Sequence, residues 1–253
     1  MAHEKMNFLN TQVNNLTMQE AVQEIARLAA AEDQSYVVAV NSDVVMKIEN
    51  DPLLRKIAGG AALVLVDGKP LMWIARFFRK PVKEKVSGSD LVPEVCRMAA
   101  AKGYSIFLLG GQEGIAEKAK CNLQKQYENI RIAGTYAPKF GFEQNPEELA
   151  KINTLINAAK PNILIVCLGC PKQEKFIHQN IGAYRANVSI CAGAAIDFLA
   201  GNMQRAPKWM SNAGLEWFFR FLQEPRRLFK RYFVDDVKII GLVVKYRKIM
   251  VKS

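Results

Sequence analysis

The sequence lacks the features that mark secreted and membrane-spanning proteins. Its first twelve residues contain no apolar segment of the kind that begins a secretory signal. No apolar run approaches the ~20 residues that a membrane-spanning helix needs, and the run IIGLVV at 239–244 is far too short. We therefore expect a cytoplasmic protein that is either soluble or peripheral on the inner face of the cell membrane.

Histidine and cysteine are scarce, with two histidines and five cysteines. Cys167 and Cys170 form a C-x-x-C, a spacing that in other proteins binds zinc or carries out redox chemistry. No second pair follows it, and the histidines are His3 and His178. The pattern favours cysteines that pack as small apolar side chains over a metal or redox site.

Phosphate-binding signatures are also missing. No D-x-D triplet occurs, so the usual metal clamp for a nucleotide diphosphate is absent, and there is no Walker A motif. The segment LLGGQEG has glycines at 110, 111 and 114, which does not match G-x-G-x-x-G, and the next predicted strand ends without an acid to hold a ribose. A nicotinamide oxidoreductase is therefore disfavoured. Gly110 and Gly111 form either a tight turn or a phosphate contact.

The formal net charge of +11 is unevenly distributed. From residue 201 onward, 12 Lys and Arg stand against 4 Asp and Glu, a net +8, whereas the first 200 residues carry a net +3. A basic segment of this kind is typical of a protein that contacts a membrane surface, a nucleic acid or a partner helix.

Apolar runs alternate with helical patterns along the first 200 residues. A capping box, Thr17-Met-Gln-Glu20, predicts a helix to about residue 31, and Ser42 is the expected cap of the next helix. Strands rich in Val, Ile and Leu with helices between them are typical of a parallel sheet covered on both faces. The expected strands are 36–40, 62–66, 104–109, 130–135, 162–168 and 187–192, with a further short strand within the first twelve residues.

These patterns predict an α/β fold with two parts. Residues 1–200 are expected to form the catalytic core, a Rossmann-like open parallel sheet with helices on both faces. Residues 201–253 are expected to form a basic helical C-terminal appendage, which we call the appendage.

Polar residues and glycines gather where the predicted strands end. Asn41 follows the first of these strands, and Asp67-Gly68 follows the second. The carboxyl edge of an open parallel sheet is where ligands bind, beside helix N-termini that favour anions. We therefore expect Asp67 at the mouth of a binding crevice. The other polar residues and glycines at strand ends are Gly110, Gly111, Tyr136, Gln173 and Asp197.

Four longer motifs occur in order along the chain. They are D-G-x-P-L-x-W from Asp67, S-G-S-D-L from Ser87, G-x-P-K-Q-E from Gly169, and G-L-E-W-x-x-R-x-x-x-E-P-x-R from Gly214. Together they resemble the WecG/TagA/CpsF glycosyltransferase family over nearly the whole chain. The resemblance implies an inverting transferase that passes a sugar, often N-acetylmannosamine or a relative, from a UDP-sugar to a polyprenyl-diphosphate-linked saccharide during cell-surface polymer assembly, such as that of teichoic acid. It also implies that no metal and no cofactor takes part.

The resemblance implies roles for three residues near the expected reaction centre. Asp67 would be the base that takes a proton from the acceptor hydroxyl; the alternative is an N-cap for the helix that follows. Asn41 would contact the donor or else form a turn, and the polar group that the family usually has two positions earlier is Ala39 here. Lys85 stands where the family has an arginine, so the charge is kept but the planar fork is lost.

Three further residues are expected to contact the donor. Gln173 would hold the sugar or the diphosphate, with helix capping as the alternative. Asp197 would accept a hydrogen bond from the uracil N–H, or else solvate the surface of a helix. Tyr136 would stack on the base, or else simply pack.

The appendage begins with an amphipathic pattern, with apolar residues at 215, 218, 219 and 222. Arg220, Arg227 and Arg231 fall on or near one face and would neutralise the departing diphosphate in place of a metal. The resemblance implies that this segment closes the site at the membrane. Association into homo-oligomers is compatible with the sequence, and we expect no nucleic-acid partner. The main rival is a non-catalytic nucleotide- or RNA-binding α/β protein that uses its basic tail.

Overall fold

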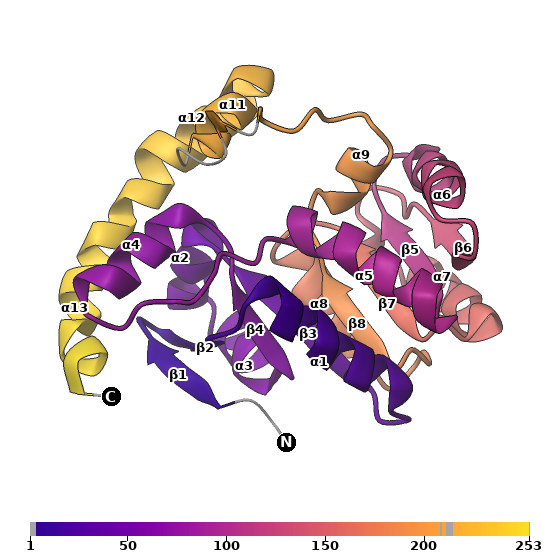
Figure 1. Ribbon diagram of the computed structural model, residues 1–253, viewed down its shortest axis with the longest axis horizontal. Helices are drawn as coiled ribbons and strands as arrows, with labels where there is room; N and C mark the ends of the chain where they lie inside the picture. The colour runs from indigo at the N-terminus through magenta and orange to yellow at the C-terminus, as the bar shows by residue number, and fades with distance from the viewer. Residues whose placement is uncertain (1–3, 208, 211–214, 253) are drawn as a thin grey trace.

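The computed structural model describes residues 4–207, 209–210 and 215–252, without the side chains of residues 227, 231, 251 and 252 (Figure 1). Its centre is a six-stranded sheet in which every neighbouring pair of strands is parallel, in the order β4-β3-β8-β7-β5-β6. The strands are β3 (Ser35–Val40), β4 (Leu63–Val66), β5 (Ser105–Gly110), β6 (Arg131–Tyr136), β7 (Ile163–Cys167) and β8 (Val188–Cys191). The predicted parallel α/β sheet is confirmed.

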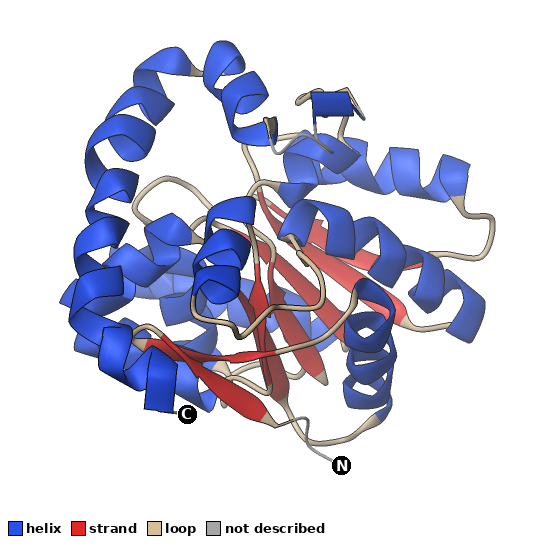
Figure 2. Cartoon of the chain, turned by 60° about the vertical axis from the view of Figure 1, so that its left-hand side comes forward, coloured by secondary structure: helices blue, strands red, loops and turns tan. Residues whose placement is uncertain are grey.

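Helices cover both faces of this sheet (Figure 2). Successive strand residues point to opposite faces, so that Val38 and Val40 join one buried cluster while Val37 joins the other. The first cluster lies under α2 (Ser42–Asn50), α3 (Pro52–Gly60), α4 (Lys69–Phe77), α7 (Pro146–Ala159) and α8 (Lys172–Asn180). The second lies under α1 (Met18–Ala30), α5 (Gly88–Lys102), α6 (Ile115–Gln126) and α9 (Ala195–Leu199).

The N-terminal segment forms two strands where one was expected. β1 (Lys5–Phe8) and β2 (Thr11–Asn14) pair antiparallel, and the Asn14 side chain accepts a hydrogen bond from the Val64 N–H at 2.8 Å. Phe8 is fully buried in the first cluster. The hairpin therefore supports the β4 end of the sheet.

The predicted capping box of α1 is confirmed at Thr17 and Glu20. The cap expected at Ser42 is wrong, because α2 already begins at Ser42 and is capped by the Asn41 side chain. An asparagine oxygen on the residue before the first helical turn satisfies a free backbone N–H as well as a serine does.

The appendage consists of α11 (Glu216–Gln223), α12 (Pro225–Lys230), a π-helical turn (Arg231–Asp235), a 3₁₀ turn (Asp236–Lys238) and α13 (Ile239–Lys252). Within the described ranges, no helix combines the length and the apolar character needed to cross a membrane. α13 lies in the segment expected to be helical, and it packs against β1 and α2, a contact that the sequence patterns did not predict (Figure 1). The division of the chain at residue 200 stays a prediction.

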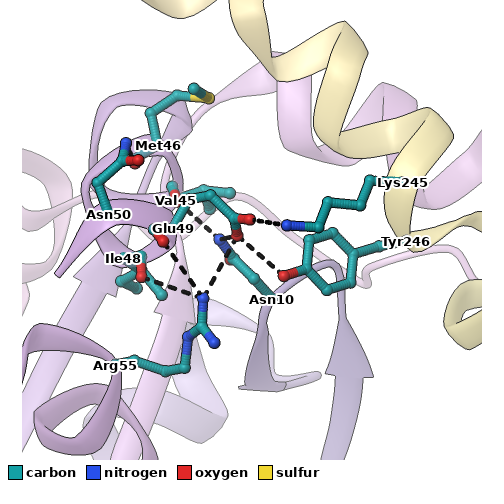
Figure 3. A network of polar contacts seen from close by, with 9 residues as sticks. All are labelled: Asn10, Val45, Met46, Ile48, Glu49, Asn50, Arg55, Lys245 and Tyr246. Atoms are coloured by element: carbon teal, nitrogen blue, oxygen red, sulfur yellow. Dashed lines mark hydrogen bonds and ion pairs between the residues drawn. The ribbon is translucent and has the colours of Figure 1, made fainter. Parts of the chain in front are cut away.

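The contact between α13 and the core has an apolar and a polar part. The Met250 side chain is fully buried, and its sulfur accepts a hydrogen bond from the Leu9 N–H at 3.2 Å. Figure 3 shows the polar part, in which Glu49 of α2 receives Lys245 Nζ at 2.5 Å and the Tyr246 hydroxyl at 2.9 Å. Asn10 Nδ2 donates to the same carboxylate at 2.9 Å. The far end of the appendage is thus fixed to the core.

Candidate active site

The carboxyl edge of the sheet brings several of the predicted residues together. After β3 the chain forms the neighbouring strand β4 at one edge of the sheet, and β5 then lies on the opposite side of β3. The strand that pairs with β3 on that opposite side is β8, the last strand in sequence. Such a reversal of strand order opens a crevice at the carboxyl ends of the strands. Asn41 follows β3, Asp67 follows β4 and Gly193 lies just after β8, so all three border this region.

Asp67 is placed by the end of β4. Its N–H donates to the Val40 carbonyl at 2.7 Å, which continues the β3–β4 pairing by one residue. The alternative that Asp67 caps α4 is wrong, because the N-cap is Gly68 and that helix start has no side-chain cap. Gly68 has a φ of +114°, which a residue with a side chain adopts only under strain. The carboxylate makes no hydrogen bond within the described residues and is only partly buried.

Burial raises the pKa of Asp67 from 3.8 to about 6, while the positive charges of Lys85 and Arg220 oppose the rise. Glu216 and Asp90 are close enough to raise it slightly further. A carboxylate with a pKa near neutrality is suited to general base catalysis, because it is ionised at pH 7 and still accepts a proton readily.

Lys85 is the centre of an ion-pair cluster beside Asp67. Its Nζ lies 3.0 Å from Asp90 and 3.1 Å from Glu216, and its side chain is 17% exposed. Asp90 also pairs with Arg205 at 2.8 Å. Since Glu216 belongs to α11 and Lys85 to the core, this cluster joins the appendage to the core beside the carboxyl edge of the sheet. Sequence reasoning missed Asp90, Glu216 and Arg205 as members of the site, although the first two lie in motifs that carry the family resemblance.

Arg220 is the predicted appendage arginine that reaches the site. Its charge lowers the pKa of Asp67, and its guanidinium lies 5.8 Å from the ring centre of Phe198. The Arg205 guanidinium lies 5.8 Å from the centre of the same ring, so Phe198 makes cation–π contacts with two arginines. The buried Nε of Arg220 has no hydrogen-bond partner among the described residues, which makes it an available donor for an anion. The side chains of Arg227 and Arg231 lie outside the described residues.

Asn41 and Gln173 each make a defined hydrogen bond. The Asn41 side chain accepts from the Val44 N–H at 3.1 Å, so it caps α2, and a donor contact through its amide nitrogen stays a prediction. The buried Gln173 accepts from the Gly193 N–H at 3.0 Å. The alternative that Gln173 caps α8 is wrong, because that helix begins without a side-chain cap. Its contact with a sugar or diphosphate also stays a prediction.

The glycines after β5 have a packing explanation. Gly110 has a φ of +122°, and a Cβ there would lie 2.3 Å from the Cys167 carbonyl oxygen. Gly111 has a φ of +78°, and a Cβ there would lie 3.0 Å from Ile115. Both glycines are therefore needed for the close approach of β5 to β7 and for the turn into α6. A phosphate contact by their backbone stays a prediction.

The two residues expected to bind the base lie on different parts of the sheet. Asp197 is partly buried in the first turn of α9. Tyr136 ends β6, where its hydroxyl donates to Glu148 at 2.6 Å. β6 and β4 are opposite edges of the sheet, five strand spacings or ~24 Å apart. A donor that met both Tyr136 and Asp67 directly would have to cross the whole width of the sheet, and both base contacts stay predictions.

The C-x-x-C cysteines are free thiols. Cys167 is buried at the end of β7, and burial raises its pKa to about 12. In the part of the chain that the structure describes, no three His, Cys, Asp or Glu side chains form a group that could hold a metal ion. The interpretation of these cysteines as packing residues fits their surroundings.

A surface groove of about 490 Å³ adjoins the ion-pair cluster. It shares Asp90 and Arg205 with that cluster, includes Phe198, and continues between α5 and α6 along Glu94 and Asn122. Asp67 is not part of its lining. We therefore place the candidate reaction centre at the strand edge, where the unpaired carboxylate and the cations meet.

Comparison with known proteins identifies the family. The model described as "Glycosyl transferase WecG/TagA/CpsF family" matches residues 6–252. A relative from Bacillus subtilis is 31% identical over 191 residues, which cover 76% of this chain and 72% of the relative. A second, from Bacillus spizizenii, is 26% identical over 218 residues, which cover 86% and 82%. Both are named N-acetylglucosaminyldiphosphoundecaprenol N-acetyl-beta-D-mannosaminyltransferase. The chain belongs to the WecG/TagA/CpsF family and is a glycosyltransferase.

Proposed function

We propose that this glycosyltransferase moves an N-acetylmannosaminyl-type sugar from a UDP-sugar to a polyprenyl-diphosphate-linked N-acetylglucosamine, with inversion at the transferred carbon. The names of the two Bacillus relatives support the acceptor and the sugar. The observation that carries the proposal is the Asp67 carboxylate at the end of β4, which has no hydrogen-bond partner among the described residues and lies within the electrostatic influence of Lys85 and Arg220.

In the proposed reaction, Asp67 removes the proton from the acceptor hydroxyl. The hydroxyl oxygen forms a bond to the anomeric carbon of the sugar as the bond from that carbon to the UDP oxygen breaks on the opposite face. The electron pair of the broken bond stays with UDP, whose added charge needs stabilisation. Arg220, with its unpartnered buried Nε, and Lys85 are the cations placed to supply it. In this proposal they take the part that a metal plays in other sugar-nucleotide enzymes.

The appendage is also our proposed membrane contact. Trp217, Phe218, Phe229 and Phe233 form linked ring contacts and remain 39–57% exposed. Exposed aromatic groups beside a net charge of +8 suit the interface of an anionic bilayer, where each Lys or Arg contributes ~1 kcal/mol. We propose that the enzyme acts at the cytoplasmic face of the membrane, where this segment would bring the site to a lipid-linked acceptor.

A transfer assay tests the reaction. A panel of UDP-sugars is incubated with a short-chain polyprenyl-diphosphate N-acetylglucosamine, and the product is analysed for mass and anomeric configuration. We expect transfer with inversion from UDP-N-acetylmannosamine or a closely related donor. UDP binding without transfer from any donor would favour the non-catalytic nucleotide-binding alternative.

Co-sedimentation with vesicles tests the membrane contact separately. We expect the full chain to sediment with anionic vesicles and a double variant, Trp217→Ala with Phe233→Ala, to sediment less. Phe140→Ala is the matched control, because Phe140 is fully exposed in a loop of the core. Equal sedimentation of all three proteins would contradict a role for the aromatic groups of the appendage.

A further inference from the structure

Glu174 is a buried carboxyl group directly beneath the carboxyl edge of the sheet. Its side chain lies on α8 and the residue is 1% exposed. One carboxyl oxygen, Oε1, accepts from Gln173 Nε2 at 2.8 Å. Oε2 has no partner with ordinary hydrogen-bond geometry among the described residues, and its carboxyl group has only weak contacts with the thiols of Cys170 and Cys191. A buried polar atom without a partner lowers stability, and an apolar side chain of similar shape would avoid that cost. The presence of a carboxyl group at this buried position therefore points to a role other than stability.

The contact with Glu174 determines which way the Gln173 amide points. A glutamine amide has one donor end and one acceptor end, and a carboxyl oxygen that accepts selects the nitrogen end. The oxygen end is consequently directed at the Gly193 N–H, from which it accepts at 3.0 Å. If the amide turned over, its NH₂ group would face the Gly193 N–H, and two donors would meet.

Gly193 belongs to the turn that connects β8 to α9. Its φ of +57° lies in the left-handed region, and the helix that carries Asp197 begins two residues later. The hydrogen bonds that Gln173 donates to Glu174 and accepts from the Gly193 N–H thus connect a buried group to the turn before α9. Because β8 pairs with β3, this turn also forms one side of the crevice.

We propose that Glu174 is a positioning residue, which orients Gln173 so that Gln173 holds the Gly193 turn, one side of the crevice, in the geometry that binds the UDP part of the donor. This inference rests on the proposed function, because the ligand concerned is the UDP part of the donor. Burial raises the pKa of Glu174, while its hydrogen bond with Gln173 opposes the rise. A neutral acid still accepts through its carbonyl oxygen, so the hydrogen bond does not need a charge.

Two substitutions of Glu174 separate orientation from stability, with the affinity for UDP measured by isothermal titration. Glu174→Gln keeps an accepting oxygen, and we expect its affinity to stay within twofold of the wild type. Glu174→Leu removes the acceptor, and we expect about tenfold weaker binding. Asn180→Leu is the matched control, since Asn180 is a buried, hydrogen-bonded residue at the other end of α8. It should lower the melting temperature without weakening UDP binding.

An exchange of the two side chains gives a second test that needs no apolar substitution. Gln173→Glu alone places two carboxyl groups in contact, and we expect at least tenfold weaker UDP binding. Adding Glu174→Gln supplies an amide donor at position 174, while the new carboxyl at position 173 still accepts from the Gly193 N–H. The double variant should bind UDP more tightly than Gln173→Glu alone.

Three results would overturn the inference. They are wild-type affinity in a folded Glu174→Leu protein, a Glu174→Gln protein that binds as weakly as Glu174→Leu, and a double variant that binds no better than Gln173→Glu. Failure of the wild-type chain to bind UDP would instead overturn the proposed function, and this inference with it. The two failures are therefore distinguishable.

Discussion

Replacement of Asp67 by asparagine is expected to make the protein more stable while it removes turnover. The pKa of Asp67 is raised from 3.8 to about 6, chiefly by burial, so the folded state holds the ionised form less readily than the unfolded state does. A rise of that size corresponds to about 3 kcal/mol of folding free energy lost above pH 6. The carboxylate is partly exposed, so solvent screening reduces our expectation to about 2 kcal/mol.

The gain in stability should depend on pH in a defined direction. Below pH 3.8 the Asp67 carboxyl is protonated in the folded and the unfolded protein, so it does not reduce the folding free energy. The loss of folding free energy grows between pH 3.8 and about 6 and is constant above pH 6. Asp67→Asn should therefore melt about 4–8 °C higher than the wild type at pH 7.5 and show almost no difference at pH 3.5. In wild-type kcat/KM, the same pKa should appear as a rise with a half-maximum near pH 6.

Turnover by Asp67→Asn should fall by ~10²–10⁴-fold, because the amide keeps the shape but cannot accept the proton. Asp90→Asn is the control in the same cluster. Burial acts to raise the pKa of Asp90, but hydrogen bonds from Ser87 and Lys85 outweigh it and hold that pKa below its ordinary value. Asp90→Asn should thus be less stable at pH 7.5. The reasoning is refuted if Asp67→Asn is destabilised at that pH, or if it keeps more than about a third of the activity.

Three other perturbations give measurable outcomes. Glu49→Ala should release α13 at a cost of about 2 kcal/mol, because the carboxylate accepts hydrogen bonds from Lys245 and Asn10. Faster tryptic cleavage within α13 would report the release. Glu20→Ala, at a partly buried residue that pairs with Lys83 far from α13, should leave cleavage within α13 unchanged. Lys85→Ala should weaken UDP binding about tenfold, and Lys85→Arg should preserve it, as measured by isothermal titration. Equal affinities of the wild type and Lys85→Ala for UDP would show that Lys85 does not contact the phosphates. UDP should bind equally well in EDTA and in magnesium, and a tenfold loss in EDTA, about 1.4 kcal/mol, would argue for a required metal.

The central sheet was predictable because its strands are buried on both faces. Such strands are apolar at every position, as Leu63–Val66 and Ile163–Cys167 are, and the pattern can be read without knowledge of the fold. The position of Asp67 follows from the same property, since the residue after a parallel strand lies at the ligand-binding edge. Both predictions depend on local sequence alone.

Contacts between distant segments could not be predicted in the same way. Lys85 and Glu216 are 131 residues apart, and their pairing depends on where the appendage packs. α13 has no local pattern that distinguishes a docking helix from a solvated one, and its contact with the core is seen only in the folded chain, where Met250 is buried. Glu174 lies within a motif that was noticed, but only its burial sets it apart from an ordinary helix-start glutamate.

The place of β8 in the sheet has a consequence for biosynthesis. β8 pairs with β3 on one side and β7 on the other, so β4-β3 and β7-β5-β6 share no strand pairing until β8 is present. On a ribosome, β8 emerges about 150 residues after β3, which at 5–20 residues per second is a delay of roughly 8–30 s. Throughout that time β3 exposes an unpaired apolar edge, and β7 exposes one from its own synthesis until β8 follows about 25 residues later. Such edges pair readily with other chains. Expression at a lower temperature, or with abundant chaperones, should therefore increase the yield of soluble protein.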